Sequence, residues 1–324
     1  MKLNHIYKSI ACGVLLAMTA TSCDLDYNPV DTYSDVTEGV NKTDEKPIFN
    51  SVQDVETSMV TLHKKFRDQQ EHWYVDKLLI GDAHSDNAYA GTTGAEVVPY
   101  ETNSIEGSNS VLKRDWDRFL GDIAVANRII VGCDQLKALS ESERGKYQSQ
   151  AKIFRAMVMF DMVRLWGNFP VITTVGGDIT EDNVEEMYPT YFPPQNTAEE
   201  AYAQIEKDLT EAVENPNTPT NDTSDKSILT KSVARAMLAK VYAEKPLRDY
   251  AKVIKYADEL AADGFDLVED FSDLWAYDTE KKDCRVRNTK EAILEAHFPP
   301  GSGNWCTWMF GRNLSNWEDR KSVV

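Results

Sequence analysis

The sequence predicts a mostly α-helical protein, built from paired helices with long irregular loops between some of them. Apolar residues recur at spacings of three and four along several stretches, which is the pattern of a helix with one buried face. The Ser/Thr-x-x-Glu sequences that begin at Ser140 and Thr197 are typical of the capping boxes that start helices. The connecting stretches are rich in Gly, Pro, Asn, Ser and Thr, as expected of loops.

Residues 1–22 are expected to be a signal peptide that is absent from the mature protein. Lys2 and Lys8 precede the apolar stretch 10–20, which is too short to span a bilayer, because a spanning helix needs about 20 residues. Small residues come directly before Cys23, so this segment resembles a lipobox, although Ala20 replaces the usual apolar residue. Cys23 would then carry a diacylglycerol and a further acyl chain (palmitate), which together would anchor the protein stably in a membrane. The alternative is an ordinary secretory signal with an accidental cysteine.

Composition limits the classes of partner. Without residues 1–22 the chain keeps 33 basic and 53 acidic side chains, a net charge of −20. Such an acidic protein is not expected to bind nucleic acid or an anionic lipid surface through broad electrostatics. Its hydrophobic fraction of 42% and its aromatic fraction of 10% argue against disorder. The sequence contains no second apolar stretch of 18 residues, so no other membrane span is predicted.

We expect a tether followed by one helical domain. Residues 23–50 are polar and are predicted to be extended, and the helical domain is expected to cover 51–324. Residues 81–110 and 188–194 are predicted to be loops. Helices are predicted, in order, from Val52 and then over 111–134, 141–166, 197–213, 228–243 and 247–263, with Gly167 ending the third.

The apolar spacing also predicts which faces of the first two helices are buried. The expected buried residues are Val55, Met59, Leu62 and Phe66 in the first helix, and Trp116, Leu120, Ile123, Ala126 and Ile130 in the second.

The last two predicted helices resemble a divergent tetratricopeptide repeat. Small residues with an aromatic residue beyond them are typical of the contact between two helices in repeats of about 34 residues. The expected contact residues are Ala234, Leu238, Ala239 and Tyr242 in one helix, and Tyr250, Ala251, Ile254 and Ala257 in its partner. Any packed helical hairpin would also explain this pattern, and both interpretations stay open at this point.

Residues 147–172 closely resemble the most characteristic stretch of the SusD/RagB family of outer-membrane glycan-binding lipoproteins. The stretch reads YQSQAKIFRAMVMFDMVRLWGNFPVI, and the residues that match the family pattern are Arg155, Ala156, Phe160, Val163, Trp166, Gly167 and Pro170. Residues 228–243 look like a later helix of the family, and the stretches 116–127 and 23–26 also fit it. Each of these motifs concerns packing, and none is a binding site.

The resemblance implies a surface-exposed, lipid-anchored nutrient-binding protein of the outer membrane of Bacteroidetes. Such proteins bind oligosaccharides and close over a SusC-like TonB-dependent transporter, which imports the captured glycan; some relatives handle peptides or other nutrients. No cofactor and no enzymatic activity are expected. Because 324 residues are few for this family, we also expect the chain to be truncated at its C-terminal end.

A glycan site needs aromatic faces for the C–H surfaces of sugars and polar side chains for their hydroxyl groups. Trp116 and Trp166 are expected in the core, and for Trp305 and Trp308 a place in the core is an equal alternative. The candidate ligand-binding residues lie in the first loop region and in the C-terminal part: Asp86, Asn87, Tyr89, Tyr100, Trp275, Tyr277, Trp305 and Trp308.

Two other functions compete with glycan capture. A helical-repeat adaptor for a protein or peptide partner shares the predicted architecture, and a glycoside hydrolase is a more remote alternative. The histidines have no metal-binding spacing and the sequence has no nucleophile or nucleotide-binding motif, so no catalytic residue and no metal are expected. Cys133, Cys284 and Cys306 form no metal motif either. A Cys284–Cys306 disulfide is one alternative in an exported protein, and isolated buried thiols are the expected state.

Overall fold

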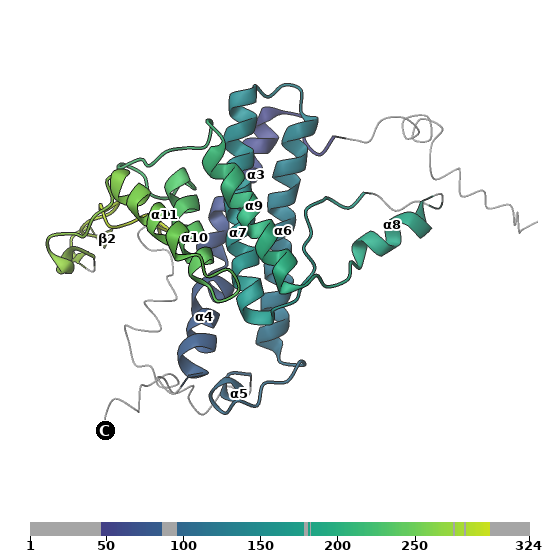
Figure 1. Ribbon diagram of the computed structural model, residues 1–324, viewed down its shortest axis with the longest axis horizontal. Coiled ribbons are helices and arrows are strands. Elements are labelled where there is room, and N and C mark those ends of the chain that lie inside the picture. Colours follow the sequence, from purple (N-terminus) through teal and green to yellow (C-terminus); the bar gives the residue numbers. More distant parts are fainter. Residues whose placement is uncertain are drawn as a thin grey trace, which may run out of the picture. The chain divides into compact units, whose positions relative to one another are not determined.

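The computed structural model describes residues 47–85, 96–177, 181, 183–274, 276–281 and 283–298. These residues are mostly helical, which confirms the predicted fold class (Figure 1). No helix within these ranges is long and apolar enough to cross a bilayer. The signal peptide, Cys23 and most of the tether lie outside the described residues, as do Asp86, Asn87, Tyr89, Trp275, Trp305 and Trp308.

The first described helix, α3 (Val52–Asp68), forms as the sequence predicts. The Ser51 side chain accepts a hydrogen bond from the Asp54 backbone N–H, and the Asp54 side chain accepts one from the Ser51 N–H, which completes a capping box. The four residues expected on its inner face are its buried residues. Each large apolar side chain buried in this way contributes about 1.5–3 kcal/mol.

After α3 the chain continues in short helical turns, the last of which runs into the predicted loop 81–110. These are the π-helical segments η2 (Glu71–Val75) and η3 (Leu79–Ala83), with α4 (Asp76–Leu78) between them. The short helix α5 (Val98–Glu101) follows later, inside the predicted loop 81–110. Leu79, Ala83, Tyr100 and Val111 form a second, small apolar cluster.

Two long helices follow, α6 (Ser110–Gln135) and α7 (Glu141–Trp166). Asn109 caps α6, the predicted Ser140–Glu143 capping box starts α7, and α7 ends at Gly167, whose φ of 73° favours glycine. The inner face of α6 was only partly predicted. Ile123, Ala126 and Ile130 are buried, but Trp116 and Leu120 are only partly buried, because Phe119 takes the central position on this face.

The second half of the chain adds α8 (Val184–Tyr191), α9 (Ala198–Glu214), α10 (Lys231–Ala243) and α11 (Tyr250–Ala262). The Thr197–Glu200 capping box at the start of α9 is confirmed. The predicted loop 188–194 is wrong in its first part, because α8 runs through Pro189. A 3₁₀ turn (Phe271–Leu274) precedes a two-stranded antiparallel sheet of β1 (Tyr277–Asp278) and β2 (Asp283–Cys284), in which Tyr277 pairs with Cys284.

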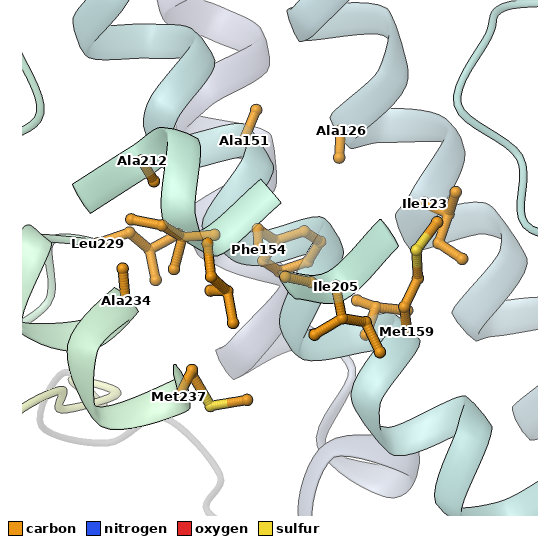
Figure 2. Close-up of a cluster of buried hydrophobic side chains, with 14 of the residues drawn as sticks. Ile123, Ala126, Ala151, Phe154, Met159, Ile205, Ala212, Leu229, Ala234 and Met237 are labelled. Atoms are coloured by element: carbon orange, nitrogen blue, oxygen red, sulfur yellow. The ribbon is translucent and has the colours of Figure 1, made fainter. Parts of the chain in front are cut away.

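Helix α7 lies at the centre of the core. It packs against α6, α9, α3 and α10, and α10 in turn packs against α9 and α11. Figure 2 shows Phe154 and Met159 of α7 among Ile123 of α6, Ile205 of α9 and Met237 of α10. A helix with neighbours on several sides must be apolar around most of its circumference, as this one is.

The predicted contact face of the α10–α11 pair is correct in α10 and wrong in α11. Ala234, Leu238 and Tyr242 are buried in α10, whereas Tyr250 and Ile254 are 58% and 61% exposed. The inner face of α11 is formed instead by Val253 and Tyr256. Val253 packs against the core, and Tyr256 stacks on Tyr242 with ring centroids 6.1 Å apart. Of the other predicted contacts, Ala239 is partly buried, and Ala251 and Ala257 are exposed.

A buried polar network joins the three central helices. Arg155 of α7 donates two hydrogen bonds to Asp208 of α9, at 2.8 and 2.7 Å, and a third to Oδ1 of Asn127 of α6, at 2.7 Å. Asn127 donates to the carbonyl oxygens of Ile172 and Thr174, at 2.9 and 3.2 Å. Arg155, Asp208 and Asn127 are at most 3% exposed, so each polar group depends on its partners in the network.

A second set of polar side chains, Asp76, Arg114 and Asp115, lies near Tyr100. Asp115 of α6 and Asp76 of α4 are hydrogen-bonded to each other, and Arg114 donates to Asp76. Burial, followed by the hydrogen bond to Asp76 and the charge of Asp76, raises the pKa of Asp115 to about 8, against the opposing effect of Arg114 and Arg118. Burial also raises the pKa of Tyr100 to about 12, with the negative charges of Asp115 and Asp76 acting in the same direction.

We predict that Arg155→Met lowers the free energy of unfolding by about 3–5 kcal/mol, because Asp208 would stay buried without its partner. Arg164→Met is the matched control on the same helix: Arg164 is 51% exposed in its ion pair with Glu244, so its loss should cost under about 1 kcal/mol. Urea denaturation of both variants measures the difference. Equal losses in the two variants would show that the network contributes no more than a surface pair.

We predict that the contribution of Asp115 to the unfolding free energy falls as pH rises from about 4 to about 8. Asp115 has a folded-state pKa of about 8 against an ordinary value of 3.8, so over this range the folded state holds a proton that the unfolded state has released. The slope from this group is at most about 1.4 kcal/mol per pH unit.

Asp115→Asn should remove this contribution and flatten the pH dependence of urea denaturation. Asp117→Asn, a change of an exposed residue on the same helix, should leave the dependence as it is in the wild type. The assignment to Asp115 is wrong if the Asp115→Asn variant keeps the wild-type slope.

Candidate ligand-binding site

Two of the predicted ligand-binding residues are described, and they occupy different environments. Tyr277 lies on β1 and is 60% exposed, so its ring is accessible to a ligand. Tyr100 of α5 is fully buried in the second apolar cluster, and in this arrangement its ring packs against protein and not against solvent. The other six candidates lie outside the described residues, so how these eight residues are grouped stays a prediction.

The described residues enclose a cavity of about 380 Å³, which lies within the size range of small-molecule sites. Residues from α3, η2, α4, α7 and α10 line it together with the segment 294–298. The lining combines aromatic and charged side chains, among them Trp73, Tyr74, Lys77, Phe160, Asp161 and Glu295.

An ion pair lies in the wall of this cavity. Lys77 Nζ is 2.5 Å from an Asp161 carboxylate oxygen and 5.0 Å from the centroid of the Trp73 ring. The Trp73 indole N–H is buried and has no hydrogen-bond partner in the part of the chain that the structure describes. The cavity thus offers a carboxylate and an ammonium group beside aromatic rings, which is a set that can bind hydroxyl groups of a small polar ligand.

A neighbouring cavity of about 310 Å³ shares Phe66, Glu295 and Ala296 with the first. Its wall includes His63, whose Nε2 lies 3.1 Å from the Gln150 side-chain oxygen. Burial lowers the pKa of His63, so this imidazole is neutral at pH 7. Among the described residues no group of three or more His, Cys, Asp or Glu side chains is placed to hold a metal ion.

Sequence patterns did not identify the residues that line these cavities. Neither Tyr100 nor Tyr277 is among the lining residues. The one sequence signal that could have indicated the first cavity is Asp161, which is a charged residue inside an otherwise apolar stretch of α7. Lys77, Lys240 and Glu295 come from segments far apart in the sequence, and no local pattern distinguishes them from ordinary surface charges.

The described cysteines differ in exposure. Cys133 is a buried free thiol, as expected, and burial raises its pKa to about 12. Cys284 is exposed, so the expectation of a buried thiol is wrong there, because the β1–β2 pair lies at the surface. Cys306 lies outside the described residues, and its pairing with Cys284 stays a prediction.

Comparisons with known proteins give one consistent result. The SusD-like family model, described as starch-binding and associating with the outer membrane, matches residues 32–243. A SusD-like protein of Bacteroides ovatus is 25% identical over 309 residues, which cover 91% of this chain and 50% of that protein.

Solved structures show the same fold. The surface glycan-binding protein A of Bacteroides fluxus superposes with a TM-score of 0.62 at 20% identity, covering 79% of this chain and 52% of its own. A laminarin-binding SusD-like protein superposes with a TM-score of 0.57 at 20% identity, covering 70% of this chain and 48% of its own. The chain thus spans about half the length of the relatives it matches. Because the family model covers well over half of the sequence, the chain belongs to the SusD-like family.

Proposed function

We propose that this protein binds oligosaccharides at the cell surface and delivers them to a SusC-like TonB-dependent transporter of the outer membrane. The observation that carries the proposal is the match of the SusD-like, starch-binding family model to residues 32–243. Similar structures include a laminarin-binding protein and a surface glycan-binding protein in complex with laminarihexaose, which supports glycans as the ligand class. A lipid on Cys23 would hold the protein beside its transporter, and the polar residues 23–50 would let it move there.

The proposed ligand contact includes the exposed ring of Tyr277, together with Asp86, Asn87, Tyr89, Trp275, Trp305 and Trp308 of the predicted set. An exposed tyrosine gives a sugar both an apolar face and a hydroxyl group. Tyr100 is not proposed as a direct contact, because its ring is fully buried. The cavity lined by Trp73, Lys77 and Asp161 offers a second group of hydroxyl-binding side chains.

Isothermal titration of the full chain against laminarin, soluble starch and host and plant glycans tests the proposal. We predict binding to at least one glycan without release of shorter products. Tyr277→Ala should raise the Kd for that glycan about two- to tenfold, because an aromatic contact contributes about 0.5–1.5 kcal/mol. Tyr277→Phe keeps the ring and is the matched control, with an affinity near that of the wild type.

Other outcomes would point to the competing functions. Shorter sugar products after incubation would indicate a glycoside hydrolase. Failure to bind any glycan of the panel would contradict glycan capture and favour an adaptor for a protein or peptide partner.

A further inference from the structure

The short helix α8 and the residue that follows it expose three aromatic side chains, named here the α8 aromatic cluster: Tyr188, Tyr191 and Phe192. They are 56%, 48% and 67% exposed, respectively. None of the side chains of α8 (Val184–Tyr191) is buried. Because exposed aromatic groups gathered in one place are uncommon on soluble proteins, such a cluster indicates a contact site for another molecule.

The rings of the α8 aromatic cluster are held in place before any ligand binds. The Tyr188 and Phe192 ring centroids are 4.9 Å apart, with an angle of 44° between the rings. The Tyr191 hydroxyl donates a hydrogen bond to the Gly177 carbonyl oxygen at 2.5 Å. A Cβ atom on Gly176 would lie 3.1 Å from the Tyr191 ring, so the glycine lets the backbone approach that ring closely. Such preorganisation lowers the entropic cost of binding.

Hydrogen bonds also fix both ends of the segment that carries α8. The Asn196 backbone N–H donates to the Phe169 carbonyl oxygen, and the Val171 N–H donates to the Asn196 side-chain oxygen, both at 2.9 Å. On the incoming side, Asn127 of α6 donates to the carbonyl oxygens of Ile172 and Thr174. The segment 171–196 therefore starts and ends at positions fixed by the helical core.

The charged side chains of the segment that carries α8 are all acidic. The sequence contains no Lys, Arg or His from residue 165 to residue 206, whereas Glu181, Glu185 and Glu186 lie within or next to α8. A ligand with negative charge would be repelled. Nucleic acids, anionic lipids and polysaccharides of uronic acids are thus disfavoured, and neutral ligands are compatible.

The size of the α8 aromatic cluster favours a small ligand over a protein. An aromatic side chain presents about 150–250 Å² when fully exposed, so three rings that are about half exposed offer on the order of 300 Å². A stable protein–protein interface buries about 800 Å² on each partner. The α8 aromatic cluster falls well short of that area, and it suits one or two sugar rings.

We propose that the α8 aromatic cluster is an additional binding site for a neutral oligosaccharide. Sugar C–H faces stack on the rings of Tyr188 and Phe192, and sugar hydroxyl groups bond to the Tyr188 hydroxyl and to the Glu185 carboxylate one helical turn earlier. The choice of a glycan as ligand rests on the proposed function. The location of the site, the neutral charge of its ligand and the small size of that ligand are argued from α8 itself.

Titration of the full chain with laminarin and with soluble starch tests this inference through the double variant Tyr188→Ala/Phe192→Ala. Loss of two aromatic contacts should raise the Kd of the bound polysaccharide about fivefold or more. Tyr250→Ala removes a tyrosine of α11 that is equally exposed (58%), and it should leave the Kd unchanged. The thermal midpoint of the double variant should stay at the wild-type value, because both rings are exposed.

The outcomes separate the two proposals. If the wild type binds a glycan and the double variant binds it equally well, the α8 site is refuted while the proposed function stands. If the wild type binds neither laminarin nor starch nor any other neutral glycan, both proposals fail. Binding of polygalacturonate that the double variant loses would contradict the preference for neutral ligands.

Discussion

The hydrogen bonds of Arg155 are the interaction on which the rest of this structure depends. A guanidinium group that is nearly inaccessible to water must have all its hydrogen-bonding partners within the protein, because an unpaired buried charge costs several kcal/mol. Asp208 and Asn127 supply these partners from two other helices. The planar fork of the arginine constrains their direction as well as their distance, so we infer that it helps to set the register in which α6, α7 and α9 pack.

The same network connects the core to the surface that we propose for ligand binding. Asn127 accepts from Arg155 and also donates to two backbone carbonyl groups of the segment that leaves α7. That segment continues into α8 and returns at Asn196, next to the cap of α9. Exposed rings on a segment with fixed ends lose little freedom on binding, which suits the proposed binding of a weakly apolar ligand such as a sugar.

Local signals predicted most helices, because capping boxes and apolar spacing act within a few residues. The start of α7 at Ser140 and the inner face of α3 are examples. Interactions between distant residues were not predictable in this way. Asp122 is buried because His72 and Lys65, about 50 residues earlier, pair with it at 2.9 and 3.1 Å. Spacing places Asp122 on the buried face of α6, three residues after Phe119 and four before Ala126, but a carboxylate is expected to be exposed unless its partners are known.

The candidate site was less accessible to prediction than the fold. Tyr100 is buried because the η3 turn and Val111 close over it, and the sequence predicts neither that turn nor the contact. The inner face of α11 differs from the tetratricopeptide pattern because Tyr256, and not Ile254, reaches Tyr242. Helix α8 was missed since Pro189 and the following prolines are typical of loops.

Hydrogen–deuterium exchange of the wild type and of the Arg155→Met variant tests the central claim most directly. If Arg155 sets the register of the core, amide protection should fall together in α6, α7, α9 and the segment 171–174. Protection in α11, which packs mainly against α10, should change least. A loss of protection confined to the turn of α7 around residue 155 would contradict the claim that this network joins the helices and fixes the segment that carries α8.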